Sequence, residues 1–322
     1  MTRLLHRSAF FALVLASFSM AVGAEGEKKT LNVLFIGNSF TARHNLSTVV
    51  KEMAEAGNPG LTFNRTDVIY GGRTLKDHWR LGTQNIVKQS TLTEVEEKAT
   101  IAALEKDVAA NPKDKYAPSA LERHRALLPK IEANRQPWDI VVLQSYRDDI
   151  EGDPTLYAEY APKFAELIKA QGARVILYET TPTTQNDKPL TAAPDAAPVL
   201  AKERAIAAVA NKIEASVAPM ALVAQRCQTE RPDLTLRFVN DAHLNQTMAY
   251  LTACTLYAAL FEKSPVGLPV NSITDTRSFE GERNDKTKDR DGNPITRQFS
   301  DKDRADLQRI AWEGWSEFQK LR

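Results

Sequence analysis

Three short apolar runs, each with a polar residue at its end or directly after it, constrain the fold of this chain most. They cover Leu31–Gly37, Trp138–Gln144 and Arg174–Thr180. Apolar runs of this length, bounded by turn residues, are typical of strands that are buried on both faces. Segments with helical spacing of their apolar residues separate them. The alternation of strand and helix therefore predicts an α/β fold, in which helices cover both faces of a parallel sheet.

The same signals predict the remaining elements of the core. We expect a strand at Leu61–Tyr70, a short last strand at Ala221–Ala224, and helices at Ser47–Ala56, Tyr157–Ala170, Val199–Val217 and Met248–Phe261. Leu234–Val239 is compatible with either a strand or a loop. Ser300 and Asp303 resemble a capping box, which predicts a C-terminal helix at about 301–320.

A long stretch between two of these strands, at about 82–137, lacks strand signals. It is rich in Glu, Lys, Ala and Leu, and Ile101, Leu104 and Val108 follow helical spacing. We interpret it as a helical insertion, polar enough to be a solvated lid or cap, within a single domain that spans 25–322. The polar stretch Val270–Phe299 contains the run DKTKDRDGNP, which lacks the ligand ladder of a calcium loop and predicts a surface loop.

The first residues have the order of a secretory signal peptide. Arg3 and Arg7 precede an apolar stretch from Ser8 to Val22, and the small residues Gly23 and Ala24 follow. We expect residues 1–24 to be removed and the mature protein to be secreted or periplasmic. No later segment approaches the length of a membrane span, so no membrane insertion is expected after cleavage.

Composition narrows the classes of partner and cofactor. The formal net charge is +1, with 42 basic and 41 acidic residues well mixed, which argues against nucleic acid and favours a small molecule or a glycan. Export permits a disulfide between Cys227 and Cys254, and two buried free thiols are equally compatible with the sequence. Neither cysteine has the partners that would mark a metal site, and we expect neither metal nor cofactor.

The first apolar run presents a candidate nucleophile. It stops at Gly37, and Asn38, Ser39 and Thr41 then open a helix. Ser39 therefore lies at the carboxyl edge of the sheet, where open α/β sheets bind ligands. In the alternative interpretation, Asn38 or Ser39 only caps the helix.

Polar residues from three other segments are predicted at the same edge. Gly71 and Gly72 end one strand, Gln144 ends another, and His243 with Asp241 stands just before the last core helix. Ester hydrolysis needs a nucleophile, a base, a group that orients the base, and N–H donors for the oxyanion. We assign these roles to Ser39, His243 and Asp241, with the backbone N–H groups of Ser39, Gly71 or Gly72 and the Gln144 amide as oxyanion donors.

At these residues the chain resembles the SGNH (GDSL-like) hydrolase superfamily. The resemblance runs over the blocks FIGNSFT, YGGRTLKDHW, WDIVVLQS and NDAHLN, and is greatest to a secreted bacterial branch with Gly-Asn-Ser and Leu-Gln blocks. It implies a flavodoxin-like, three-layer α/β/α sandwich. It also implies cleavage of esters or thioesters, many of them acetyl esters on polysaccharides. The spacing of His78 from the double glycine is similar to that of the branch, and makes His78 a candidate substrate-binding residue. In the alternative interpretation it is only a half-buried histidine at the start of a helix.

The chain departs from the superfamily pattern at three positions. Asn38 stands where an Asp precedes the nucleophile, and Gln144 stands where an Asn is usual. The pattern Asp-x-x-His is also shifted, because Asn240 lies three residues before His243 and Asp241 only two. Asp241 could orient His243 through a shifted loop, Asn240 could do so more weakly, or the enzyme could work as a dyad.

The function expected from the sequence is a secreted serine esterase that removes small acyl groups, acetyl above all, from a carbohydrate. Two alternatives stay open at this point. The shifted acid suits a non-catalytic glycan-binding protein on the same fold, and a lipase or thioesterase would need an apolar cap. His44 and His124 are expected on helix surfaces without a role.

Overall fold

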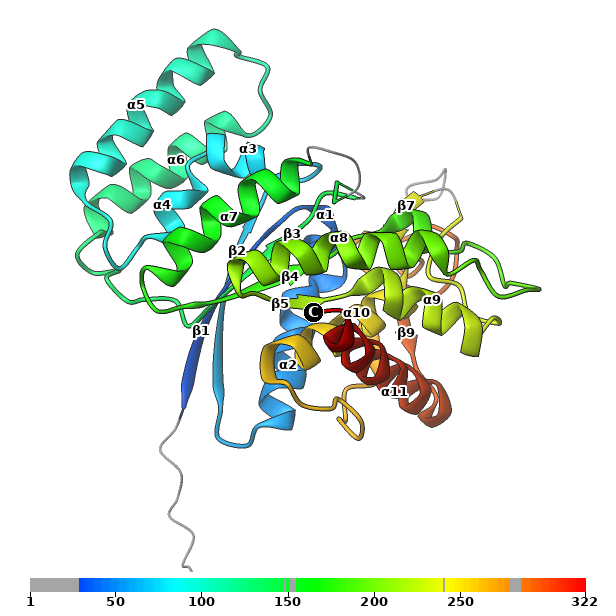
Figure 1. Cartoon of the computed structure of the whole chain (residues 1–322). Coiled ribbons are helices and arrows are strands. Elements are labelled where there is room, and N and C mark those ends of the chain that lie inside the picture. The colour runs from blue at the N-terminus through cyan, green and yellow to red at the C-terminus, as the bar shows by residue number, and fades with distance from the viewer. Residues whose placement is uncertain (1–28, 148, 151–154, 240, 278–284) are drawn as a thin grey trace, which may run out of the picture.

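The computed structural model describes residues 29–147, 149–150, 155–239, 241–277 and 285–322, so the predicted signal peptide lies outside the described residues. A five-stranded sheet in the order β2-β1-β3-β4-β5 forms the centre, and all of its neighbouring strands run parallel (Figure 1). Its strands are β1 (Thr30–Gly37), β2 (Thr62–Ile69), β3 (Ile140–Gln144), β4 (Arg174–Tyr178) and β5 (Ser216–Ala218). The predicted parallel α/β fold is confirmed.

The register of the sheet brings the carboxyl ends of three strands together. Ile36 of β1 pairs with Val68 of β2 on one side and with Leu143 of β3 on the other. The residues that follow these strands therefore emerge at one edge, although they are far apart in the sequence. This edge holds the candidate nucleophile and both glycines.

Helices cover both faces of the sheet, which gives the three layers of an α/β/α sandwich. In β1, Val33 and Phe35 face one core, whereas Leu34 and Ile36 face the other, because successive side chains of a strand point to opposite faces. The first core is closed by α2 (Leu46–Gly57), α10 (Gln246–Phe261), α11 (Asp301–Phe318) and most of α9 (Met220–Glu230). The second is closed by α3 (Leu75–Arg80), α4 (Thr83–Val87), α7 (Leu156–Lys169) and α8 (Ala197–Ile213). No helix in the described part of the chain is both long and apolar enough to cross a bilayer.

One predicted strand is wrong. Residues Ala221–Ala224 belong to α9, and the last strand of the sheet is β5, which lies just before that helix. The helix α8 ends earlier than predicted, at Ile213, where Glu214 adopts a left-handed conformation with φ 52°. An apolar run of four residues fits a buried helix as well as a buried strand, so periodicity could not distinguish them here.

Two helices of the segment between β2 and β3 project from the sheet. They are α5 (Glu94–Ala110) and α6 (Ala117–Leu127), which lie side by side in Figure 1, with α6 next to α3 and α4. His124 joins them, since its Nδ1 lies 2.7 Å from Glu97 Oε1 and its Nε2 lies 3.2 Å from the carbonyl oxygen of Leu81. Both His124 and Glu97 are fully buried, so the prediction that His124 lies on a helix surface is wrong.

Two small antiparallel sheets stand beside the main one. In the first, β6 (Arg237–Phe238) pairs with β7 (Asp241–Leu244), and in the second β8 (Ser272–Thr274) pairs with β9 (Thr296–Gln298). The stretch Val270–Phe299, predicted as a surface loop, therefore contributes two strands. It also reaches the candidate site, as described below.

The two cysteines are free. Cys227 and Cys254 are both buried in the core between the sheet and its covering helices, and they form no disulfide. Burial raises the pKa of the Cys227 thiol to about 12, because the interior disfavours the thiolate. The sequence was compatible with a disulfide or with two buried free thiols, and the structure shows two buried free thiols.

Candidate active site

Ser39 is the first residue of the short helix α1 (Ser39–Ala42), which begins directly after β1. The cap of this helix is Asn38, whose Oδ1 accepts a hydrogen bond from the N–H of Phe40 at 3.1 Å. Because Asn38 caps the helix, the Ser39 hydroxyl is not needed for capping. It lines a cleft of about 410 Å³ at the carboxyl edge of the sheet.

His243 is in hydrogen-bond contact with that hydroxyl. It lies in β7, and its Nε2 is 2.7 Å from Ser39 Oγ. Its imidazole stacks on the ring of Phe40, with 5.0 Å between the centroids and 30° between the planes. This contact fixes the ring, so that Nε2 can accept the hydroxyl proton.

Asp241 orients His243, although it stands only two residues before it. Its Oδ1 lies 2.5 Å from His243 Nδ1 and accepts the backbone N–H of His243 at 3.1 Å. An aspartate that binds the N–H two residues ahead forms a local turn, and this turn brings its carboxylate beside the ring. The structure thus completes a Ser39–His243–Asp241 triad, whereas Asn240, the alternative orienting residue, lies outside the described residues.

Two arginines hold the outer oxygen of the Asp241 carboxylate. Oδ2 lies 3.3 Å from a terminal nitrogen of Arg43 and 2.8 Å from one of Arg290. Arg43 is buried and is held in turn by Asp275, which accepts hydrogen bonds from Nε at 2.9 Å and from Nη2. Burial alone would raise the pKa of Asp241, but its bonds to His243 and the Arg290 charge outweigh burial and hold that pKa well below its usual range.

Sequence reasoning missed these supporting residues. Arg43 lies only four residues after Ser39, which was the one local signal for its role. Asp275 and Arg290 come from the polar stretch that was predicted as a surface loop. No sequence pattern indicates that residues of this stretch contact the triad.

We expect Arg290→Gln to lower kcat by about tenfold, because a triad carboxylate that is less firmly held orients His243 less well. Asp241 keeps its contact with Arg43 in this variant, so the loss should be partial. Ester hydrolysis at saturating substrate measures it. The matched control is Lys288→Gln on the same loop, which removes an exposed charge without touching Asp241. Equal kcat values for the two variants would contradict this role of Arg290.

The double glycine lines the same cleft as the triad. It forms a turn in which Arg73 N–H donates to the carbonyl oxygen of Tyr70 at 3.1 Å, and Gly72 has a φ of +68°, which favours glycine. Tyr116, from the segment that joins α5 and α6, donates its hydroxyl to the carbonyl oxygen of Gly71 at 2.7 Å and steadies the turn. No residue in the described ranges accepts a hydrogen bond from the N–H of Ser39, Gly71 or Gly72.

The prediction that Gln144 donates to an oxyanion is wrong. Its side chain is buried, and its Nε2 donates to Asn38 Oδ1 at 2.7 Å and to the carbonyl oxygen of Ser145 at 2.9 Å. Its Oε1 accepts the backbone N–H of Asn38 at 3.0 Å and the Thr41 hydroxyl at 2.5 Å. Every hydrogen of the amide is therefore engaged, and Gln144 supports the turn that carries the nucleophile. A side chain at Gly37 would collide with it, since a Cβ there would lie 2.4 Å from Gln144 Oε1.

His78 does not line the cleft either, so its predicted role in substrate binding is wrong. It is fully buried, with Nε2 2.9 Å from the carbonyl oxygen of Gly37 and Nδ1 3.1 Å from the Thr83 hydroxyl. His44, predicted on a helix surface, is also buried and lies 2.9 Å from the carbonyl oxygen of Leu244. Both histidines stabilise backbone that leads to the triad.

Because of these two histidines, we expect the protein to lose stability in mild acid. Burial lowers the pKa of His78 and of His44 from 6.5 to about 4, because the interior disfavours the charged ring. As the pH falls through 6.5, the unfolded chain takes up protons that the native state accepts only near 4. The stabilisation is therefore complete above 6.5 and is lost between 6.5 and about 4. Each histidine should lower the free energy of unfolding by about 2 kcal/mol between pH 6.5 and 5.

Urea unfolding at several pH values measures this loss. In His78→Gln, whose amide can still donate to the Gly37 carbonyl, we expect a shallower fall of the free energy of unfolding over the same interval. A fall as steep as that of the wild-type protein would contradict the assignment of His78.

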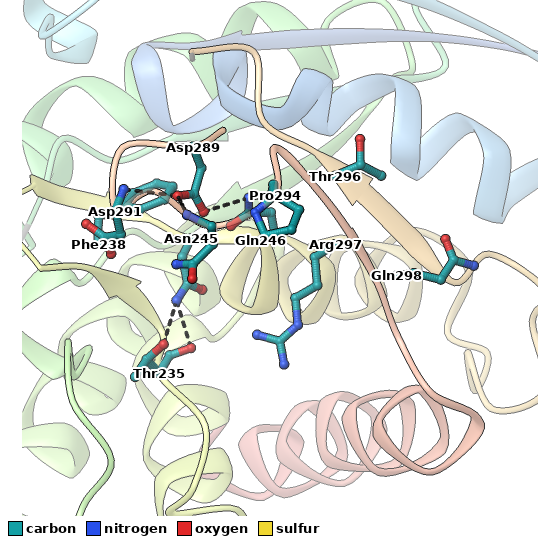
Figure 2. A pocket seen from close by; sticks show the side chains of 11 residues that line it. Thr235, Phe238, Asn245, Gln246, Asp289, Asp291, Pro294, Thr296, Arg297 and Gln298 are labelled. Atoms are coloured by element: carbon teal, nitrogen blue, oxygen red, sulfur yellow. Dashed lines mark hydrogen bonds between the residues drawn. The ribbon is translucent and has the colours of Figure 1, made fainter. Parts of the chain in front are cut away.

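A cavity of about 550 Å³, larger than the cleft, is lined by residues of the Asp289–Asn293 turn and by Asn245 and Gln246, which follow β7 (Figure 2). Figure 2 shows Asn245 bonded to Thr235 and Gln246 bonded to Asp289, with Arg297 to their right. The residues that line this cavity include no serine, cysteine or histidine, so it holds no pair of nucleophile and base. The described residues also include no group of three or more His, Cys, Asp or Glu side chains that could hold a metal ion.

Comparisons with known proteins return two solved structures. One is a candidate SGNH hydrolase from Slackia heliotrinireducens, 20% identical, with a TM-score of 0.43 over 72% of this chain and 100% of its own. The other is a DUF4886 family protein from Bacteroides uniformis, 17% identical, with a TM-score of 0.49 over 88% of this chain and 94% of its own. No protein-family model and no curated protein matches the sequence. Likenesses this distant say nothing of activity, which has to be judged from the site itself.

Proposed function

We propose that this protein is a serine esterase that removes small acyl groups, with acetyl as the expected group, from a carbohydrate. The observation that carries the proposal is the hydrogen-bonded series Ser39–His243–Asp241 in an open cleft. A serine hydroxyl becomes a nucleophile when a neighbouring base takes its proton, and the base works best when a carboxylate orients it and stabilises its charge.

The proposed reaction follows from these contacts. As Ser39 Oγ attacks the ester carbonyl, its proton passes to His243 Nε2, and the imidazolium is stabilised by Asp241. The oxyanion is bound by the N–H groups of Ser39 and of Gly71 or Gly72. Gln144 does not donate to it, because both hydrogens of its amide are engaged elsewhere. His243 then gives its proton to the departing alcohol. Water, deprotonated by the same imidazole, releases the acid from the acyl-enzyme.

The side chains that line the cleft support a small acyl group and a sugar as the alcohol. Lys115, Tyr116, Tyr146 and Arg147 line it together with the triad. Phe40 and Ala242 are the only lining residues whose side chains are wholly apolar, so a long acyl chain would find few such side chains to pack against. Sugars present hydroxyl groups, which suit tyrosine and charged side chains as partners. The predicted signal peptide suits a substrate outside the cytoplasm.

A series of p-nitrophenyl esters from acetate to octanoate tests the acyl group. We expect kcat/KM to be highest for acetate and to fall as the chain lengthens, since few wholly apolar side chains line the cleft. Release of acetate from acetylated oligosaccharides, compared with release from p-nitrophenyl acetate, tests the sugar. A kcat/KM that rises with chain length would replace this proposal with a lipase or thioesterase.

A serine-directed phosphonate separates an enzyme from a glycan-binding protein on the same fold. We expect stoichiometric labelling of Ser39 in the folded wild-type protein, located by peptide mass. Folded protein that stays unlabelled and hydrolyses none of these esters would count against catalysis.

A further inference from the structure

The cleft that holds the triad is lined by more positive than negative charge. Among the described residues that line it, Lys115, Arg147 and Arg277 are cationic, and Asp241 alone carries a carboxylate. These cations come from three distant segments: the connection between α5 and α6, the residues after β3, and the residues after β8. The tertiary structure therefore concentrates a charge that the sequence, with its net charge of +1, does not reveal.

Asp241 does not offset this charge. Its carboxylate is already engaged by His243 and lies within ion-pair distance of Arg43 and Arg290. Asp241 is thus not available to pair with Lys115 or Arg147. Clefts lined by one sign of charge focus the field and raise the local concentration of oppositely charged substrates.

Two of the cations are free to bind a ligand. Neither Lys115 nor Arg147 has a carboxylate oxygen within 4.0 Å in the described part of the chain, and both side chains are exposed. Both side chains are therefore available to an anionic ligand, unlike Arg125, Arg135 and Lys163, which pair with carboxylates.

Contacts within the cleft keep these two side chains near its aromatic walls. Lys115 Nζ lies 5.4 Å from the centroid of the Tyr116 ring, and Arg147 Cζ lies 5.6 Å from that of Tyr146. Arg147 also has a φ of 49°, a conformation that costs energy in a residue other than glycine, and Thr180 Oγ1 donates to its carbonyl oxygen at 3.0 Å. Arg147 thus adopts a backbone conformation that glycine would adopt at a lower energy cost.

We infer that the natural substrate is an ester whose alcohol part carries an anionic group, such as the carboxylate of an acidic sugar, and that Lys115 and Arg147 bind this group. This inference rests on the proposed function, because it names the class of substrate for the same triad. A carboxylate and a sulfate share the chemistry that these cations recognise.

Matched chromogenic esters test the inference. The pair is 4-nitrophenyl acetate, which is neutral, and 3-carboxy-4-nitrophenyl acetate, which carries one carboxylate at neutral pH. The value to measure is the ratio of kcat/KM for the anionic ester to that for the neutral ester, divided by the ratio of their rates of alkaline hydrolysis. We expect this corrected ratio to be about ten at low ionic strength and to approach one in about 0.5 M NaCl.

Charge reversal identifies the residues. Lys115→Glu and Arg147→Glu should each lower the corrected ratio by about tenfold, and the double variant should lower it further. Lys113→Glu is the matched control, because Lys113 is exposed, lies two residues from Lys115 and does not line the cleft. Thermal unfolding of each variant shows that the fold is retained.

The outcomes separate this inference from the function on which it rests. Hydrolysis of the neutral ester with a corrected ratio near one would overturn the inference and leave the esterase intact. A preference that survives in the double variant would overturn the roles of Lys115 and Arg147. If neither ester is hydrolysed, the proposed function fails and the inference falls with it. A series that replaces the carboxylate by a sulfonate distinguishes a carboxylate from a sulfate as the natural group.

Discussion

Ser39→Ala should lower the kcat for p-nitrophenyl acetate by about 10³-fold or more. The variant keeps the cleft and its N–H groups but lacks the oxygen that His243 Nε2 faces at 2.7 Å. Without a nucleophile no acyl-enzyme forms, and His243 could at best activate water. Steady-state rates at several enzyme concentrations, compared with the rate in buffer, measure the loss.

The same variant should unfold at nearly the temperature of the wild-type protein. Asn38, not Ser39, caps the helix, so the substitution removes no cap and leaves no buried partner without a hydrogen bond. Ser119→Ala, at an exposed serine of α6, is the matched control and should keep both activity and stability. A Ser39→Ala protein that is folded and still active would remove Ser39 from the mechanism.

Asp241→Asn should lower kcat by about 10²- to 10⁴-fold. An amide at this position can hold the ring, but it cannot stabilise the imidazolium that forms when His243 takes the proton from Ser39. It also leaves Arg43 and Arg290 beside a neutral group, so we expect a lower melting temperature as well. Kinetics on the folded fraction, well below that temperature, separates the two effects.

The comparison with Asn240→Ala decides which residue orients the histidine. Because Asp241 already contacts both the N–H and the ring of His243, Asn240→Ala should change kcat little. A large loss in Asn240→Ala together with a small one in Asp241→Asn would reverse the assignment. A small loss in both variants would indicate a dyad of Ser39 and His243.

The core, and the positions of Ser39 and His243 in the site, could be predicted from the sequence because the signals that indicate them are local. Burial on both faces of a sheet requires continuous apolar runs, and a covering helix requires apolar residues at helical spacing, so both signals are local. The carboxyl ends of parallel strands meet at one edge, which predicts that Ser39 and Gly71-Gly72 lie close together. The predicted strand at Ala221–Ala224 failed because a short apolar run carries no such period.

Polar side chains were harder to place, because their partners are set in three dimensions. Gln144 stands at the end of a strand, as predicted, yet its amide turns inward to Asn38 and Ser145. His78 follows the double glycine at the expected spacing, yet it is buried against Gly37. A buried polar group has to find a hydrogen-bond partner, and spacing along the chain does not say which partner is near.

A parallel α/β sheet, with a serine at the carboxyl edge of its first strand and a histidine just before its last core helix, can be predicted from the amino-acid sequence. The bond between Asp241 and that histidine, and the contacts of Arg43 and Arg290 with Asp241, are visible only in the folded protein. The tertiary structure also decided which cations line the cleft. Hydrophobic periodicity is written in neighbouring residues, whereas ion pairs and the charge of a cleft arise between segments that meet only when the chain has folded.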